Sequence, residues 1–150
     1  GAHVALVEVN PLSARVTITG YWICHDSGRL INPMVVEGQI QGGVALGIGS
    51  ALLEEIVYDA EGQPLAGSYM DYLLPTATDV PAMTIDHLET LSPLNPLGIK
   101  GVGESGALPV PAVLASAIED ALGAGGGRVT RMPLGLARLH ALLAPPDARA

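Results

Sequence analysis

Apolar and polar residues come close to strict alternation at the start of the chain, over residues 3–9 and again over residues 15–21. A period of two is typical of a strand with one buried face. The residues between these two stretches, Asn10-Pro11-Leu12-Ser13, favour a turn. The pattern therefore predicts an N-terminal β-hairpin.

A long, mainly apolar run at residues 34–55 follows Gly28 and Pro33, which interrupt the strand pattern, and it predicts a helix. Gly43 and Gly47 are four residues apart and share one face of that helix. Because each glycine in an exposed helix costs roughly 1 kcal/mol relative to alanine, close packing must compensate. Another backbone or a flat cofactor is expected on this face, although core packing alone explains the glycines equally well.

The remaining pattern completes an α+β fold, a mixed or antiparallel sheet with packed helices. It predicts a second hairpin from residues 56–59 and 68–73, a strand at 83–88, a helix at 110–122 and a last short helix from Pro133 to residue 143. Residues 145–150 are expected to fray. The 150 residues are 49% apolar, which is enough for one core, so residues 1–144 are predicted to form one domain.

Charge and targeting signals narrow the possible partners. The net charge of -8, from 7 Lys and Arg against 15 Asp and Glu, would repel a polyanion, so nucleic acid is not an expected partner. Neither a membrane-spanning run nor a signal peptide is indicated, and a cytoplasmic location is expected. The chain starts within a strand pattern and without Met, which suggests a fragment of a longer subunit.

Metal ligands are not expected from this chain. Cys24 is the only cysteine, which excludes an internal disulfide and any site built from several of its own thiolates. The acidic residues along the first half are scattered without metal-ligand spacing and are explained as solvated residues or caps: Asp26, Glu37, Glu54, Glu55, Asp71 and Asp79.

One carboxylate occurs inside a glycine-rich segment, Gly98-Ile-Lys-Gly-Val-Gly-Glu-Ser-Gly106. Glycine lets a backbone approach a ligand closely, whereas a carboxylate is costly to bury without partners. Residues 90–106 lack periodicity, and long ordered loops are usually functional. The segment therefore predicts that Glu104 accepts a proton near a bound cofactor; the alternative is a solvated loop acid.

Two other interpretations of this segment are weaker. Residues 101–106 satisfy G-x-G-x-x-G, but no hydrophobic strand precedes them, prolines delay the next helix, and Glu104 is where a pyrophosphate would lie, so a dinucleotide site is not expected. Ser105 is close to a nucleophile elbow, with the second glycine one residue early. A serine hydrolase using His25, His87 or His140 as its base remains an alternative.

Two amides in the predicted glycine-rich helix suit the polar edges of a cofactor. Gln39 and Gln41 follow Glu37 at intervals of two residues. Residues two apart on a helix do not face the same side, so the three cannot all reach one ligand. Their amides can both donate and accept hydrogen bonds.

Several motifs in one order resemble the molybdenum-binding large subunit of the xanthine dehydrogenase family. They are Gly28-Arg-Leu-Ile-Asn-Pro33, Val36-Glu-Gly-Gln-Ile-Gln-Gly-Gly43, and Gly47-Ile-Gly followed by Glu54-Glu55. Three more are similar to the aerobic carbon monoxide dehydrogenase-type branch: Asp71-Tyr-Leu-Leu-Pro-Thr76, Asp79-Val-Pro81 and Ser92-Pro-Leu-Asn-Pro-Leu-Gly-Ile-Lys-Gly-Val-Gly-Glu104. The resemblance covers nearly the whole chain.

This resemblance implies a C-terminal molybdopterin-binding domain and a set of site residues. The cofactor would be molybdenum with molybdopterin cytosine dinucleotide, together with copper in the strict carbon monoxide branch. Glu104 would face the metal as catalytic base. Cofactor contacts would come from Gln39, Gln41, Lys100, Gly101, Val102 and Gly103.

The resemblance also implies a reaction and partners. A substrate carbon would be hydroxylated with oxygen from water, and the electrons would leave through iron-sulfur and FAD subunits. The substrate class stays open between carbon monoxide, aldehydes and N-heterocycles. The rest of the large subunit would complete the pocket, in a dimer of heterotrimers, so the isolated chain should be inactive. A noncatalytic assembly or scaffold domain that keeps the family fold is the alternative.

Overall fold

A computed structural model describes residues 1–144, and it confirms an α+β fold with a mixed sheet. The tail predicted to fray, residues 145–150, lies outside the described residues. No helix within residues 1–144 is both long enough and apolar enough to cross a membrane. In chain order the elements are β1 (Ala2–Asn10), β2 (Arg15–Asp26), α1 (Pro33–Leu52), β3 (Met83–Leu88), α2 (Val110–Leu122), a 3₁₀ turn (Gly123–Gly125) and α3 (Leu136–Leu143).

The sheet has the order β1-β2-β3. β1 runs antiparallel to β2, from the pair Asn10 and Arg15 at the turn to the pair Ala2 and Cys24, and β3 runs parallel to β2. The turn forms because the Asn10 side-chain oxygen accepts hydrogen bonds from the backbone N–H groups of residues 12 and 13. The predicted hairpin is confirmed, with a longer second strand, and the strand at residues 83–88 is confirmed with the same bounds.

The helix α1 begins and ends at identifiable backbone contacts. The Asn32 side chain accepts a hydrogen bond from the Val35 N–H, and Pro33 occupies the first helical position, where no N–H donor is needed. At the other end, the N–H groups of Leu53 and Glu54 both donate to the Gly49 carbonyl. The helix therefore ends three residues before the limit predicted from the sequence.

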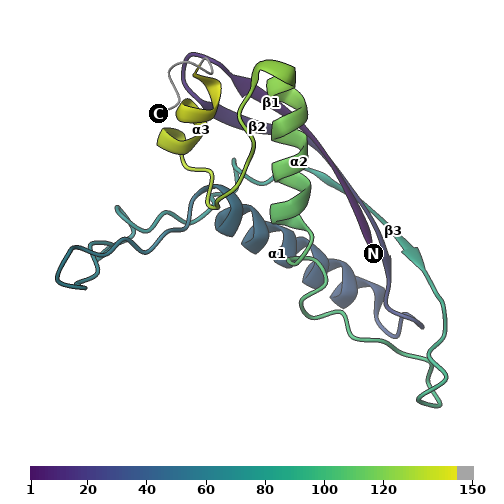
Figure 1. Ribbon diagram of the computed structural model, residues 1–150. Coiled ribbons are helices and arrows are strands. Elements are labelled where there is room, and N and C mark those ends of the chain that lie inside the picture. The colour runs from purple at the N-terminus through teal and green to yellow at the C-terminus, as the bar shows by residue number, and fades with distance from the viewer. Residues whose placement is uncertain (145–150) are drawn as a thin grey trace.

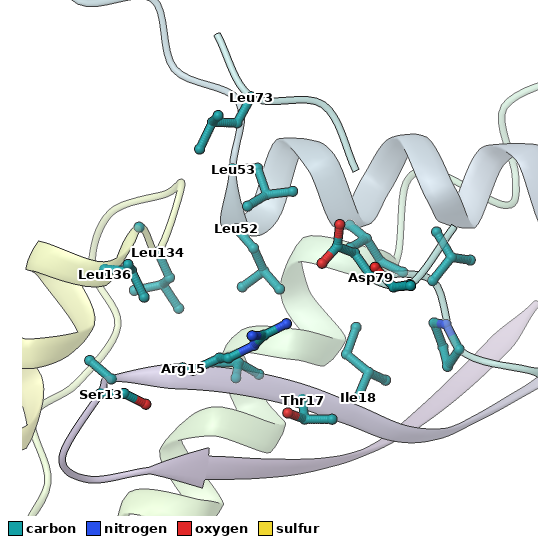
Figure 2. A pocket seen from close by; sticks show the side chains of 17 residues that line it. Ser13, Arg15, Thr17, Ile18, Leu52, Leu53, Leu73, Asp79, Leu134 and Leu136 are labelled. Atoms are coloured by element: carbon teal, nitrogen blue, oxygen red, sulfur yellow. The ribbon is translucent and has the colours of Figure 1, made fainter. Parts of the chain in front are cut away.

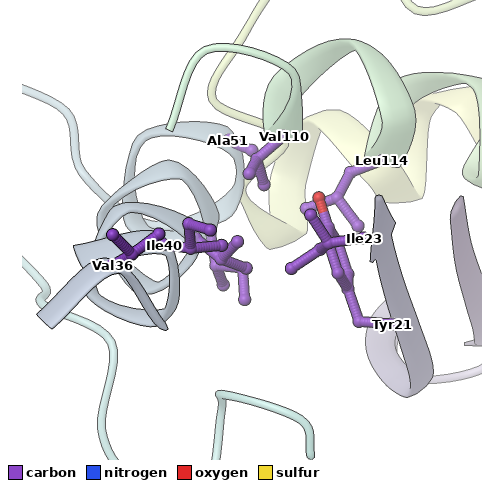
Figure 3. Close-up of a cluster of buried hydrophobic side chains, with 9 residues drawn as sticks. Tyr21, Ile23, Val36, Ile40, Ala51, Val110 and Leu114 are labelled. Atoms are coloured by element: carbon purple, nitrogen blue, oxygen red, sulfur yellow. The ribbon is translucent and has the colours of Figure 1, made fainter. Parts of the chain in front are cut away.

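Helix α2 packs against β1 and against α1, and both helices contribute to one core with β2 (Figure 1). Figure 3 shows the resulting core, in which Tyr21 and Ile23 of β2 face Ile40 of α1 and Leu114 of α2. A smaller cluster around Ile118 and Leu139 joins α2 to α3. The predicted helix at residues 110–122 is confirmed with the same bounds.

The glycines of α1 allow close contact with the chain's own backbone. A Cβ on Gly43 would lie 3.0 Å from the backbone nitrogen of Ala107, and a Cβ on Gly47 would lie 2.6 Å from Cβ of Val110. From the opposite side, a Cβ on Gly106 would lie 2.5 Å from the Ile40 carbonyl oxygen. The backbone that the sequence predicted on this face is therefore the end of the loop that precedes α2.

The predicted second hairpin is wrong. Residues 56–73 contain only an isolated bridge between Tyr58 and Pro64, and this segment extends away from the sheet and helices (Figure 1). Local bonds occupy its backbone, because the Ser68 carbonyl accepts from the N–H groups of Asp71 and Tyr72. Without a packing surface, the strand-like composition of the segment does not produce a ladder.

The last helix begins at Leu136, three residues later than predicted from Pro133. The reason is a competing contact of the preceding segment. The Leu134 N–H donates to the Ala51 carbonyl at the end of α1 with an N–O distance of 2.7 Å, and the Leu134 side chain is buried. This contact satisfies one of the carbonyls that a helix end leaves unpaired.

The glycine face of α1 predicts opposite effects for two alanine substitutions in one helix. Gly47→Ala places a Cβ against Val110 and should destabilise the chain by about 1–3 kcal/mol. Gly42→Ala is the control, because no atom of the described residues outside its own helix backbone and chain neighbours lies within 4 Å of its added Cβ, and it should stabilise the helix by about 0.5–1 kcal/mol. Urea unfolding of the chain measures both free energies. Equal stability of the two variants would contradict the packing described.

Candidate functional site

Hydrogen bonds hold the first residues of the glycine-rich loop, residues 98–106, in place. Gly98 has a φ of +69°, and its carbonyl accepts hydrogen bonds from the N–H groups of Arg29 and Ser92. The Asn95 side chain accepts from the Ile99 N–H and donates to the Ile99 carbonyl, with distances of 3.1 and 2.9 Å. The first turn of the loop is therefore tied to residues that follow β2 and β3.

Asp26, at the end of β2, joins three segments of chain. One carboxylate oxygen accepts from the N–H groups of Gly28 and Thr90, and the other lies 2.8 Å from Nζ of Lys100. The Lys100 hydrogen bond, followed by the one from the Gly28 N–H, holds the pKa of Asp26 well below its ordinary value. The sequence suggested only a solvated residue or cap, because two of its three partners, Thr90 and Lys100, lie 64 and 74 positions away.

Lys100 is a predicted cofactor contact, and the structure shows both of its nitrogens engaged. Its backbone N–H donates to the Ser27 carbonyl at 2.8 Å, and its ammonium group pairs with Asp26. The Ser27 hydroxyl is buried and has no hydrogen-bond partner among the described residues. Lys100 thus fixes the loop against the end of β2.

Of the two predicted glutamines, the structure brings only Gln39 to the loop. Its Nε2 donates to the Gly103 carbonyl at 2.9 Å, and Gln39 shares its helix face with Gly43. Its side-chain oxygen has no hydrogen-bond partner within residues 1–144 and can accept one from a ligand. Gln41 is exposed on a different face of α1, and its amide makes no hydrogen bond to the described part of the chain.

The Glu104 side chain is exposed and has no hydrogen bond or ion pair with any described residue. Its backbone is held, because its carbonyl accepts from the N–H groups of Ala107 and Leu108 at 3.0 and 3.3 Å. Gly101 and Gly103 leave open space, because no described residue other than their chain neighbours lies within 4 Å of an added Cβ. The loop therefore presents a carboxylate next to uncovered backbone.

Ser105 has two hydrogen-bond contacts on the inner side of the loop. Its Oγ donates to the Val102 carbonyl at 2.8 Å and lies 3.0 Å from Nε2 of His25. His25 is only 4% exposed, and burial lowers its pKa. The sequence named Ser105 as a candidate hydrolase nucleophile and left its base open among His25, His87 and His140. Of the other candidate bases, His87 lies opposite His25 on β3 but makes no hydrogen bond to Ser105, and His140 is on α3.

The residues of this site offer open backbone and polar side chains to a ligand. Two glycine backbones are open, the Gln39 amide oxygen has no hydrogen-bond partner within residues 1–144, and the Glu104 side chain is exposed. Residues 1–144 contain no group of three His, Cys, Asp or Glu side chains placed to hold a metal ion. The site can therefore bind the body of a ligand and take up a proton beside it.

A separate cavity of about 460 Å³ lies at the other end of α1 (Figure 2). Its walls are mostly apolar, with Leu52 and Leu53 from α1 and Leu134 from the segment before α3. Arg15 and Asp79 add charge, and hydrogen bonds from Thr76 lower the pKa of Asp79. None of the residues predicted for the cofactor site lines this cavity.

Comparisons with known proteins identify the domain and show how much of a larger protein it represents. Residues 1–81 match the molybdopterin cofactor-binding domain family. Over 133 residues, the chain is 40% identical to the nicotine 6-hydroxylase large subunit of Paenarthrobacter nicotinovorans. The aligned region covers 89% of this chain and 16% of that protein. The carbon monoxide dehydrogenase large chain of Hydrogenophaga pseudoflava is 38% identical over 105 residues, or 70% of this chain and 13% of that one.

A solved structure is similar over almost the whole fold. Quinoline 2-oxidoreductase from Pseudomonas putida 86 superposes with a TM-score of 0.91 and is 44% identical, over 94% of this chain and 18% of the other. The chain thus spans less than a fifth of the length of these relatives.

The contacts of Asp26 predict a pH-dependent stability. Because its pKa is lowered in the folded state, its ionised form stabilises the fold fully above the ordinary value of 3.8, and this contribution is lost as the pH falls further. Asp26→Asn should lower the urea midpoint at about pH 7, with a smaller difference from the natural chain at about pH 2. Asp120→Asn, an exposed position on α2, is the control. A difference that does not depend on pH would contradict the assignment.

Proposed function

Because this chain belongs to the molybdopterin cofactor-binding domain family of the molybdenum hydroxylases, we propose that it is the C-terminal cofactor-binding part of such an enzyme's large subunit. The resemblance seen in the sequence is confirmed, both to the xanthine dehydrogenase family and to carbon monoxide dehydrogenase large chains. We propose that residues 1–144 form one domain of that subunit. The observation that carries the functional proposal is the unpaired Glu104 carboxylate beside the open loop backbone.

The lengths and names of the relatives indicate which other parts would complete the enzyme. Several of them are named as subunits or large chains, which supports a place in a multi-subunit complex. We propose that the rest of the large subunit, an iron-sulfur subunit and an FAD subunit complete a cytoplasmic enzyme, as a dimer of heterotrimers. On this proposal the isolated chain is inactive, because it supplies one wall of the pocket.

The loop and α1 would hold the cofactor, proposed here as the molybdenum-containing cytosine dinucleotide form of molybdopterin. When bound, this group supplies the two-electron redox centre. Gly101 and Gly103 would let its edge approach the backbone, and Val102 lies between them. The free amide oxygen of Gln39 would accept a hydrogen bond from it. Lys100 keeps the loop in place through Asp26, and Gln41 would reach a different part of the cofactor.

Glu104 would act as the general base. In the overall reaction, a substrate C–H and one water yield a C–OH group, two protons and two electrons. The carboxylate accepts one of the protons, and the electrons leave through the partner subunits. Because Glu104 carries no other hydrogen bond or ion pair among the described residues, it is available for this role. General-base catalysis of this kind contributes roughly two to four powers of ten in rate.

We propose an N-heterocyclic substrate. Two of the most similar relatives are named for nicotine and quinoline, and both names describe chemistry on a nitrogen-containing ring system. Carbon monoxide and aldehydes are the alternatives, and a carbon monoxide site with copper would need a cysteine from the part of the subunit outside this chain. The substrate-selecting residues are expected there as well.

Glu104→Gln in the assembled enzyme tests the base. The substitution keeps the shape and removes the proton acceptor, so kcat should fall by roughly 10²- to 10⁴-fold while the molybdenum content is unchanged. Glu61→Gln, in the exposed turn after Asp59, is the control and should keep full turnover. Retained turnover with an unchanged pH profile in Glu104→Gln would reject the role. Absence of molybdenum from the natural complex would instead favour the noncatalytic scaffold.

The two glutamines differ in their expected effect on cofactor binding. Gln39→Leu removes both the hydrogen bond to the Gly103 carbonyl and the free acceptor, so the purified complex should contain less molybdenum and pterin. Gln41→Leu, on another face of α1, should lower the content less. Metal analysis and pterin fluorescence after oxidation measure both. A larger loss in Gln41→Leu would reverse this assignment.

A further inference from the structure

His25 and Ser105 meet beneath the carboxylate-bearing loop and have no part in the proposed chemistry. His25 lies near the end of β2, and Ser105 directly follows Glu104. Their side chains are in contact although the residues are 80 positions apart in sequence. Such a buried contact needs an explanation, because it brings a titratable ring against the loop that holds the proposed base.

The hydrogen positions on Ser105 and His25 follow from which of their neighbours can only accept a hydrogen bond. The Ser105 hydroxyl carries one hydrogen, and the Val102 carbonyl, 2.8 Å away, can only accept. The Ser105 proton therefore belongs to that hydrogen bond. Oγ then acts as an acceptor toward Nε2 of His25 at 3.0 Å, so the ring must carry its hydrogen on Nε2.

We propose that His25 is a positioning residue for Glu104, donating from Nε2 to Ser105 Oγ while Ser105 donates to the Val102 carbonyl. This proposal rests on the proposed role of Glu104 as base. The two hydrogen bonds connect the rigid sheet to both ends of the short segment, residues 102–105, that contains Glu104. Gln39 holds the same segment from α1 through the Gly103 carbonyl.

The same geometry separates this arrangement from a hydrolase dyad. A nucleophilic serine must donate its proton to an unprotonated ring nitrogen. Here the ring nitrogen that faces Ser105 is the donor, and the serine proton is directed to a backbone carbonyl. No described residue makes a hydrogen bond to Nδ1 of His25, so no third group orients the ring as a base.

The ring stays a donor in either charge state. Burial lowers the pKa of His25, which favours the neutral ring near pH 7. A doubly protonated ring also has its hydrogen on Nε2, so protonation would preserve the contact. The inference therefore predicts a change in loop order and in kcat when the donor is removed, without a new group in the pH profile.

Amide hydrogen exchange in the assembled enzyme tests the structural part. His25→Leu removes the hydrogen bond to Ser105, and Ser105→Ala removes both that bond and the one to the Val102 carbonyl, so in each variant the amides of residues 100–106 should exchange about five- to tenfold faster than in the natural enzyme. His25→Gln keeps a donor at nearly the same place and should restore slow exchange. His140→Leu, on the exposed side of α3, is the matched control and should leave the loop unchanged.

Steady-state kinetics with the same variants test the positioning part. If the enzyme with His25→Leu does not assemble, Ser105→Ala still tests the positioning role, because that substitution lies on the loop itself. Both should lower kcat more than they change KM, with the pH profile unmoved, and the double variant should be no worse than the poorer single one. His25→Gln should recover most of the turnover.

Three results would overturn the inference: unchanged loop exchange in Ser105→Ala, faster exchange with full kcat, or covalent labelling of Ser105 by a fluorophosphonate probe. The outcome is separable from that of Glu104→Gln. If Glu104→Gln keeps full turnover while Ser105→Ala loosens the loop and lowers kcat, the base assignment fails and His25 still orders a loop that catalysis requires.

Discussion

The close packing of two backbones governs this structure. Gly43 and Gly47 on α1, together with Gly106 on the loop, remove the side chains that would keep the loop away from the helix. A Cβ on Gly106 would lie 2.5 Å from a helix carbonyl, so the loop can occupy this position only with glycine there. The direction in which Glu104 leaves the loop depends on this contact, because the backbone on both sides of it is fixed.

Polar contacts hold the loop in the position that the glycines of α1 allow. Asp26 and Ser27 at the end of β2 bind Lys100, His25 reaches Ser105, and Gln39 binds Gly103. These partners belong to the sheet and to α1, which share the main core. The proposed base is therefore an exposed carboxylate on a hydrogen-bonded backbone, next to the open backbone of Gly101 and Gly103.

The sequence predicted those elements that have a strong local pattern. Alternation located the hairpin and β3, and apolar spacing located α1 and α2. Composition alone failed at residues 56–73, where strand-forming residues have no layer to pack against. In the site, Glu104 and the glycines could be read from a motif. The contacts of Asp26 and of His25 could not, because each joins positions more than 60 residues apart.

A crystal structure of the complete enzyme with its cofactor bound tests the central claim most directly. The measured quantity is the distance from the Glu104 carboxylate to the ligands of the molybdenum, with loop residues 98–106 resolved. The account predicts that the carboxylate lies within hydrogen-bond reach of them, directly or through one water, and that the loop still packs on Gly43 and Gly47. A carboxylate directed into bulk solvent, away from the metal, would contradict it.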